Sequence, residues 1–150
     1  MSHSYVCNRV HAIFSTKERR RHVNGDLQPR LYAFISTVAR DRGITVLAIG
    51  GAEDHIHILL SLPATITLAK ALQTLKGVSS KWIHDTFPAK KGFAWQEGYG
   101  AFSVSISQIP KTVDYIKNQR QHHKKQSFEE EFLLFLKKHG IEYDPRFVLG

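Results

Sequence analysis

The sequence predicts an α+β fold of the ferredoxin-like class, in which strands and helices follow one another as β-α-β-β-α-β. Hydrophobic periodicities of strand and helix type alternate in that order along the 150 residues, and two further helical segments follow. No repeat, low-complexity tract or Ser/Gly-rich linker divides the chain. We therefore expect one domain over 1–150, with a core at 1–108 and a helical extension at 109–150. Such a fold packs helices on one face of an antiparallel sheet and leaves the other face free for a site or a partner.

The first half of this order begins with a strand at 4–15, whose apolar residues are β-branched or aromatic. A helix is expected at 26–42, because its apolar residues recur at helical spacing. Asp26 is a suitable N-cap for this helix, and Gly43 stands where a left-handed C-terminal residue is favoured. The stretch ITVLAIGGA at 44–52 then predicts a second strand, which its two glycines weaken at the end.

The second half of the order begins with DHIHILLSL at 54–62, a strongly apolar strand that Pro63 ends. A helix is expected at 67–86, where leucine, valine, tryptophan and isoleucine residues are spaced for one face. The stretch YGAFSVSIS at 99–107 alternates between apolar and polar residues, which indicates the fourth strand.

Two helices make up the predicted extension. The first begins at Pro110, a residue favoured in the first turn of a helix, and runs to about 125. The second begins at Ser127, which forms the S-x-x-E capping pattern with Glu130, and it ends in the stretch KKHG. The extension therefore adds a pair of helices to the six-element core.

The chain is basic, with 21 Lys and Arg residues against 13 Asp and Glu residues and a formal net charge of +8. An excess of this size on a small domain favours a polyanionic partner, usually nucleic acid. The single cysteine, Cys7, excludes an internal disulfide, and no apolar run has membrane-spanning length. The first residues lack the pattern of a secretory signal. We therefore expect a cytoplasmic protein with no membrane partner.

Two histidines stand at alternate positions of the strand at 54–62. Residues i and i+2 of a strand point to the same face, so His55 and His57 can reach one ion or one phosphate together. Two histidines on a solvated sheet face are the alternative, and the pair alone does not decide between them. Asp54 precedes the pair, but strand alternation places its side chain on the opposite face from His55.

A second set of polar groups lies in PKTVDYIKNQRQHHKK, at 110–125. Tyr115 and Gln119 are four residues apart, so they share one face of the predicted helix. The apolar side of this helix is thin, which indicates that it presents polar groups to a ligand; an exposed basic helix with a half-buried tyrosine is the alternative. The sequence gives no role to His122 or His123.

Taken together, the two sets make a catalytic centre. Two imidazoles and a glutamine carbonyl, from His55, His57 and Gln119, form an N,N,O set for a divalent metal with open positions for substrate. Tyr115 lies one turn before the third ligand and is placed as a nucleophile. A phenol has a pKa near 10, so a metal that polarises the scissile phosphate would offset its weakness. The product would be a phosphotyrosine, which conserves the energy of the phosphodiester.

These residues stand within a wider resemblance. The chain resembles the HUH single-tyrosine transposases of the insertion-sequence 200/605 family over nearly its whole length. The matching stretches, in order, are HAIFSTKERR, HIH, LKGVSSKW, WQEGYGAFSVS, YIKNQ and the tail HGIEYDPRFVLG. Position 118 is Asn, so the two-tyrosine pattern of related replication initiators is absent.

The resemblance implies an enzyme that cuts and rejoins single-stranded DNA with hairpins at the ends of a mobile element. It implies a 5′-phosphotyrosine on Tyr115, a free 3′-hydroxyl, and a homodimer in which the tyrosine helix can serve the partner's histidines. It also implies a metal held by His55, His57 and Gln119, taken in this family to be Mg²⁺ or Mn²⁺. Imidazole ligands fit Mn²⁺ better than Mg²⁺, and the sequence does not choose between the two. No small-molecule substrate is expected.

DNA binding requires phosphate-neutralising charges and stacking surfaces. We expect contacts from two groups: Lys17, Arg19, Arg20 and Arg21 in the loop after the first strand, and Lys76, Ser80 and Lys81 in the second helix. A solvated charge run and a core helix with ordinary exposed lysines are the respective alternatives. Trp95 and Tyr99 can stack on bases, although aromatic residues in such segments are more often part of the core.

Two other function classes stay open. One is a non-catalytic nucleic-acid-binding module on the same fold, although histidines stand where such modules carry stacking rings. The other is a domesticated relative that keeps the fold in a host role. The complete set of His55, His57, Tyr115 and Gln119 favours retained catalysis.

Overall fold

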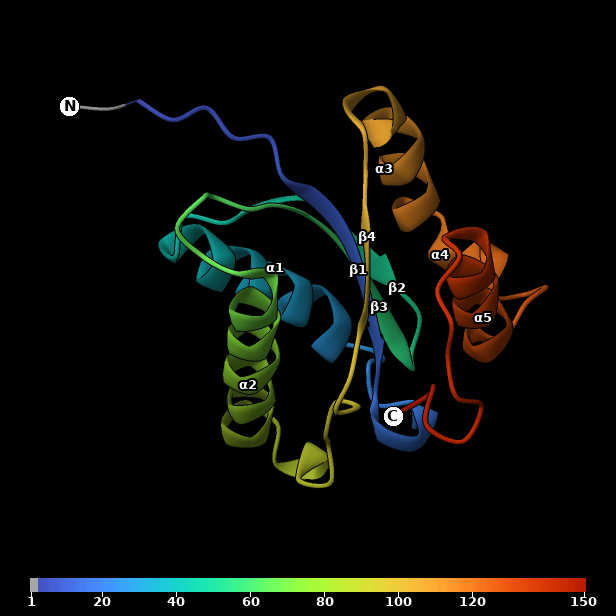
Figure 1. The fold of residues 1–150 in the computed structure, drawn as a ribbon. Coiled ribbons are helices and arrows are strands. Elements are labelled where there is room, and N and C mark those ends of the chain that lie inside the picture. The colour runs from blue at the N-terminus through green and yellow to red at the C-terminus, as the bar shows by residue number, and fades with distance from the viewer. Residues whose placement is uncertain (1–2) are drawn as a thin grey trace.

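A four-stranded antiparallel sheet in the order β2-β3-β1-β4 forms the centre of the chain (Figure 1). The computed structural model describes residues 3–150. The strands are β1 (Arg9–Ser15), β2 (Thr45–Gly51), β3 (His55–Ser61) and β4 (Gly100–Ser103). This is the strand order of a ferredoxin-like sheet, so the predicted fold class is confirmed.

Helices cover both faces of the sheet. The helices are α1 (Leu27–Asp41), α2 (Leu68–Thr86), α3 (Ile109–Lys117), α4 (Gln119–His122) and α5 (Phe128–Lys138). In Figure 1, α1 and α2 lie on one side of the sheet, and α3, α4 and α5 lie on the other. The expectation that the second face stays free is therefore wrong, because the C-terminal extension folds back over it. No helix of residues 3–150 is long and apolar enough to cross a membrane.

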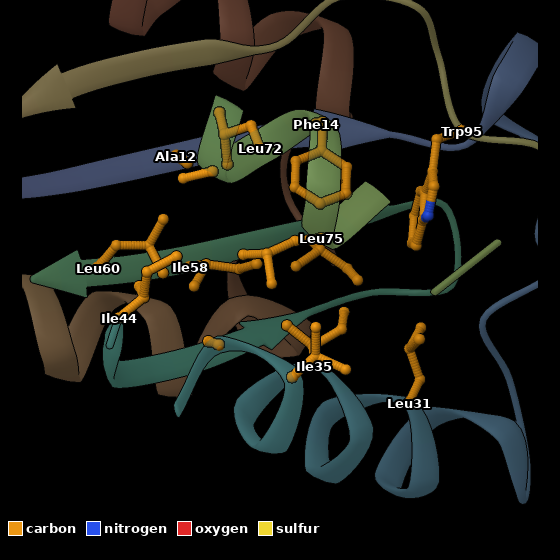
Figure 2. Close-up of a cluster of buried hydrophobic side chains, with 14 of the residues drawn as sticks. Ala12, Phe14, Leu31, Ile35, Ile44, Ile58, Leu60, Leu72, Leu75 and Trp95 are labelled. Atoms are coloured by element: carbon orange, nitrogen blue, oxygen red, sulfur yellow. The ribbon is translucent and has the colours of Figure 1, made fainter. Parts of the chain in front are cut away.

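The main core fills the space between the sheet and the first two helices (Figure 2). Phe14 and Ile58 enter it from the sheet, Ile35 enters from α1 and Leu72 from α2, and all four are almost completely buried. Trp95 closes one end of this core, where its ring lies edge-on to Phe14 with centroids 4.9 Å apart. The core therefore uses one set of alternate positions in the two central strands.

The other set of alternate positions faces the extension. In β3 this set contains His55, His57 and Leu59, all of which are buried. The antiparallel register places Ile13 of β1 opposite His57, and it places Gly50 of β2 on the other side of that histidine. The histidine pair therefore lies in the middle of the second face, with a neighbouring strand on each side.

The first and last strands are shorter than predicted. Pairing of β1 begins at Arg9, opposite Ser61, because Pro63 ends the partner strand just beyond that point. On the other edge of β1, β4 ends at Ser103, opposite Val10, so the pairing stops near the same end. The predicted ranges 4–15 and 99–107 are therefore too long, because residues without a pairing partner lie outside β1 and β4.

The predicted helix boundaries hold to within a residue or two, apart from the tyrosine helix. Gly43 has a φ of +76°, in the left-handed region predicted for the end of α1. Ser127 caps α5 by accepting a hydrogen bond from the backbone N–H of Glu130 at 3.2 Å, as predicted. The side chain of Asp26 makes no cap bond; its carboxylate pairs with Arg30 at 3.3 Å instead.

The predicted helix at 110–125 is divided in two. Asn118 adopts a φ of −101° and a ψ of 22°, so α3 ends before it and the short α4 begins after it. Its side-chain amide donates to the carbonyl of Asp114 at 2.9 Å, a bond that competes with the continuing helix. Tyr115 and Gln119 therefore lie on separate helices, on either side of this break.

Candidate active site

The site is built on the buried histidine pair of β3. His55 and His57 have no exposed surface, and their ring centroids are 5.2 Å apart. Burial lowers the pKa of His57 to about 4, although the neighbouring Glu131 opposes the change. His57 is therefore a neutral imidazole at physiological pH, which is the form that binds metal ions.

The tyrosine helix reaches the histidines because it packs directly on the sheet. A Cβ at Gly50 would lie 2.3 Å from the backbone oxygen of Ile116, so only glycine allows α3 to approach β2 this closely. Ile116 then packs with Leu59 and Ala48 in a small apolar cluster beneath α3. This contact fixes the distance between α3 and the sheet, and with it the position of Gln119 relative to the histidine pair.

Gln119 lies against the first histidine of the pair. Its side-chain oxygen is 3.0 Å from Nε2 of His55, and the side chain is buried. The amide nitrogen of Gln119 donates to the backbone oxygen of Tyr115 at 3.4 Å, which turns the oxygen toward the imidazole. The structure thus brings three sequence-predicted ligands, His55, His57 and Gln119, to the second face of the sheet.

Two side chains without a predicted role complete the cluster. Glu131 of α5 places Oε1 2.9 Å from Nε2 of His57 and 3.8 Å from Nε2 of His55. His123 follows α4 and places Nε2 3.1 Å from the same carboxylate oxygen and 3.0 Å from the oxygen of Gln119. One ligand atom each from the three histidines and the glutamate lie within 4.8 Å of one another. The cluster is therefore rich in metal-binding groups.

A signal for Glu131 was present in the sequence. The apolar stripe of α5 includes Phe128, Phe132 and Phe135, and Glu131 stands at a position of this stripe, three residues after the first phenylalanine. A carboxylate on the buried face of an amphipathic helix requires a buried partner. His123 offered no comparable pattern, because it stands in a run of polar residues.

Further polar groups orient both histidines from behind. Nδ1 of His55 is 2.8 Å from Oδ1 of Asp54, and Nδ1 of His57 is 2.8 Å from Nε2 of His11. The first contact contradicts the alternation argument, because Asp54 precedes β3 and is not bound by the alternation of a strand. Partners of this kind fix the orientation and the tautomer of a metal-binding imidazole.

The hydrogen-bond partners of His55 show why this cluster fits a cation. Nδ1 faces the Asp54 carboxylate, an acceptor, so the tautomer with its proton on Nδ1 presents a lone pair at Nε2. That lone pair faces the side-chain oxygen of Gln119, another acceptor, at 3.0 Å. Two acceptors at this distance repel each other unless a proton or a metal ion lies between them, so the donor set fits a metal ion.

Tyr115 lies beside the same cluster in the same chain. Its hydroxyl donates to Oε2 of Glu131, and its ring stacks on that of His122 with centroids 4.6 Å apart. Burial and the adjacent carboxylate raise the pKa of the Tyr115 phenol above its ordinary value. Burial alone would raise the pKa of Glu131, but hydrogen bonds from the imidazoles and the phenol outweigh it and hold that pKa well below its usual range.

An open cleft of about 730 Å³ between α3 and α5 leads to the tyrosine. Tyr115 and Glu131 line this cleft, together with His11 from the sheet. Lys111 of α3 also lines it, as do two consecutive lysines of α5, residues 137 and 138. Tyr115 is therefore reached through a cleft whose walls carry positive charge, which suits an anionic ligand.

The predicted DNA-contacting residues lie elsewhere on the surface. Lys17, Arg20 and Arg21 are exposed, whereas Arg19 pairs with Glu129 of α5 at 2.9 Å. Glu18 and Arg19 both have a positive φ, of 57° and 55°, so this loop holds two residues in a sparsely populated conformation. The loop is thus linked by an ion pair to α5, which covers the histidine pair.

The second predicted group is more involved in internal contacts. Lys76 donates to the backbone oxygens of Gln96, Glu97 and Gly98 at 2.7, 3.2 and 2.8 Å, so its ammonium group orders that loop. Lys81 is exposed and pairs with Asp85, and Ser80 is partly buried. Trp95 belongs to the core, which is the more common position for an aromatic residue in such a segment. Its indole N–H donates to the Ser79 hydroxyl at 3.0 Å.

The fold and the site together define a class of protein: a ferredoxin-like sheet with buried histidines on one face, over which a C-terminal extension places a tyrosine. Comparison with known families gives the particular group. Residues 4–119 match the family described as Transposase IS200 like, and this match covers most of the chain. The chain therefore belongs to the IS200-like transposase family, as the resemblance predicted.

Curated relatives and solved structures agree with this assignment. The transposase for insertion sequence element IS200 of Salmonella typhimurium is 26% identical over 129 residues, which cover 83% of this chain and 84% of that protein. The ISDra2 transposase TnpA of Deinococcus radiodurans is 25% identical over 114 residues, 73% of this chain and 81% of its own length.

Two solved structures share the fold. A crystal structure of a candidate transposase from Deinococcus radiodurans superposes with a TM-score of 0.65 at 25% identity, covering 79% of this chain and 96% of that chain. A REP-associated tyrosine transposase bound to a REP hairpin superposes with a TM-score of 0.61 at 19% identity, over 82% and 73% of the two chains. The second likeness supports the fold alone.

Proposed function

We propose that this protein is a DNA transposase that cleaves and rejoins single-stranded DNA at the ends of a mobile element through a covalent 5′-phosphotyrosine. One observation carries the proposal. In a chain of the IS200-like transposase family, the Tyr115 hydroxyl meets a buried cluster that contains His55, His57 and Gln119, at the end of a basic cleft. The proximity of this hydroxyl to groups that can hold a metal ion supports Tyr115 as the nucleophile of our proposal.

His55, His57 and Gln119 are the ligands that we propose for a divalent ion, Mg²⁺ or Mn²⁺. The lone pair of the His55 Nε2 atom and the facing oxygen of Gln119 support this assignment. When bound, such an ion polarises the scissile phosphate and stabilises negative charge on oxygen. Asp54 and His11 hold the two imidazoles in orientation from behind.

In the proposed reaction, the phenol oxygen of Tyr115 forms a bond to the scissile phosphorus. The bond from that phosphorus to the 3′-oxygen of the preceding nucleotide breaks, and this oxygen leaves as a 3′-hydroxyl after taking a proton from solvent. The phenol proton has an acceptor in Glu131, to which the hydroxyl already donates. The tyrosine ester keeps the energy of the phosphodiester, so attack by a 3′-hydroxyl reverses the step and rejoins DNA.

The DNA partner that we propose is single-stranded and carries hairpins. A hairpin is bound by the structural relative described above, and the net charge of +8 in this chain suits a polyanion. Proposed phosphate contacts are Lys17, Arg19, Arg20, Arg21, Ser80 and Lys81, together with the lysines that line the cleft. Lys76 acts in our proposal by ordering the loop at 96–98, because its ammonium group already donates to three carbonyls. A cytoplasmic homodimer is part of the same proposal.

A covalent-adduct experiment tests the proposal. Wild-type protein incubated with single-stranded hairpin DNA and Mn²⁺ is expected to give a DNA-linked protein band on a denaturing gel. The Tyr115→Phe variant is expected to give none, whereas Tyr99→Phe, which changes a tyrosine outside the cleft, keeps the band. An adduct of equal yield in Tyr115→Phe would refute the assignment. Salt-dependent DNA binding without any adduct would favour a non-catalytic binding module.

A further inference from the structure

Glu131 occupies an unusual position, because its two carboxylate oxygens face different groups. Oε1 lies 2.9 Å from Nε2 of His57 and 3.1 Å from Nε2 of His123. Oε2 accepts the hydroxyl of Tyr115. The side chain is 2% exposed, so its charge depends on these partners and not on water. No residue of the predicted ligand set comes from α5, so this carboxylate is an addition to that set.

The distances among the ligand atoms match those around a metal ion. Ligand atoms about 2.0–2.2 Å from a common ion lie roughly 2.8–3.6 Å from their neighbours in octahedral or tetrahedral arrangements. The contacts of Oε1 in Glu131 and of the oxygen in Gln119 with the imidazole nitrogens are 2.9, 3.0, 3.0, 3.1 and 3.8 Å. Each of the five side chains therefore has a ligand atom within 3.1 Å of another member of the cluster, a spacing that ligands of one ion also show.

The kind of ligand indicates the kind of ion. Imidazole nitrogens suit first-row transition ions such as Mn²⁺, Co²⁺ and Zn²⁺, whereas Mg²⁺ prefers oxygen ligands and keeps several waters. A set with three imidazoles, one carboxylate and one amide oxygen supplies too much nitrogen and too little room for water to suit Mg²⁺.

We propose that Glu131 and His123 are metal ligands in addition to His55, His57 and Gln119, so that the extension completes a centre selective for a transition ion over Mg²⁺. This rests on the proposed function and deepens it, because the centre is the one that would serve Tyr115, and it narrows the ion from Mg²⁺ or Mn²⁺ to Mn²⁺ or a similar ion. One carboxylate would then connect the ion to the nucleophile, with Oε1 on the metal and Oε2 on the phenol. Metal binding and the position of α5 would depend on each other.

Cobalt binding tests the proposal without DNA. Co²⁺ bound by imidazole and carboxylate ligands has a visible absorption spectrum that reports its coordination, and titration gives its affinity. We expect one Co²⁺ per chain, and retention in the presence of a large molar excess of Mg²⁺. Glu131→Gln and His123→Gln should each weaken Co²⁺ binding by at least about tenfold and change the spectrum.

Matched variants separate ligation from general effects on folding. Glu130→Gln changes the neighbouring exposed glutamate and keeps a residue suited to the capping box, so it should bind Co²⁺ as the wild type does. Thermal melting of the metal-free proteins checks that each variant is folded, and Glu131→Asp serves as a second probe if the glutamine variant is not.

The outcomes are distinct from those of the adduct experiment. Wild-type affinity and spectrum in folded Glu131→Gln, or displacement of Co²⁺ by an equal concentration of Mg²⁺, would overturn the proposal. Either result leaves the role of Tyr115 untouched. Conversely, Co²⁺ binding that needs Glu131 would stand even if Tyr115→Phe still formed an adduct, in which case the transposase chemistry fails and the metal centre does not.

Discussion

Gly50 is the residue on which the tyrosine helix rests. A side chain there would meet the backbone carbonyl of Ile116, which cannot turn aside as the end of a flexible side chain can. The glycine therefore acts on the site from a distance, because the height of α3 above the sheet sets where Tyr115 and Gln119 lie. A residue with no functional group therefore controls the position of Tyr115.

We expect Gly50→Ala to destabilise the protein by about 1–3 kcal/mol, the usual cost of forcing extra atoms into a packed contact. The same change should slow adduct formation, because α3 must lift away from β2. Urea unfolding measures the first effect and a time course of adduct yield measures the second.

Gly77, which lies within α2, provides the matched control. A Cβ at this position would meet nothing within 4 Å. Gly77→Ala should stabilise the helix by about 0.5–1 kcal/mol. Unchanged stability and adduct yield in Gly50→Ala would contradict the role that we assign to Gly50.

At the scale of elements, α3 and α5 form the two walls of the cleft that leads to Tyr115. Helix α5 is attached to the sheet by a second apolar cluster, in which Phe128, Phe132 and Leu136 pack against Ile13 and Phe102. Helix α5 therefore packs on the sheet through its apolar side and presents Lys137 and Lys138 to the cleft. This arrangement suits an anionic chain that must approach a half-buried tyrosine.

We expect the double change Lys137→Ala and Lys138→Ala to weaken the binding of single-stranded hairpin DNA. For single strands, each lost phosphate contact lowers the slope of log affinity against log salt by about 0.7. Fluorescence anisotropy at several salt concentrations measures this slope.

The control is Lys70→Ala, which removes an exposed lysine from α2 on the opposite side of the sheet. It should leave the slope unchanged. A double variant with the wild-type slope would show that the cleft does not take the DNA backbone.

At the scale of the whole molecule, a single chain holds every group of the site. Only residues 104–108 connect β4 to α3, and they can extend to at most about 18 Å. Moving the tyrosine helix to a partner chain would also break its contact with Gly50. We therefore propose that Tyr115 serves the histidines of its own chain, even if the protein is a dimer.

Mixing two inactive variants tests this assignment. One variant lacks both His55 and His57, the other carries Tyr115→Phe, and each is inactive in our proposal. We expect no covalent adduct in the mixture, because no chain then holds a complete site. Wild-type protein mixed with either variant should keep its adduct. Adduct formed by the two variants together would show that the tyrosine crosses between chains.

The sequence by itself determined the order of the elements along the chain. Period-two alternation in β3 also placed His55 and His57 on one face, and the S-x-x-E pattern fixed the start of α5 at Ser127. These features are local: each depends on residues within a few positions, where periodicity and capping act directly. The division into a core at 1–108 and an extension at 109–150 stays a prediction.

Only the tertiary structure decided what covers the second face and what meets there. His57 and Glu131 are 74 residues apart and touch because α5 folds back over the sheet, and His11 reaches the same histidine from β1. A hydrophobic pattern tells that a face is buried but not which element buries it, because packing depends on the shapes and distances of the assembled elements. Local periodicity was therefore enough to predict that His55 and His57 share a face. The position of the Glu131 carboxylate between the histidines and Tyr115 depends on how α5 packs on the sheet.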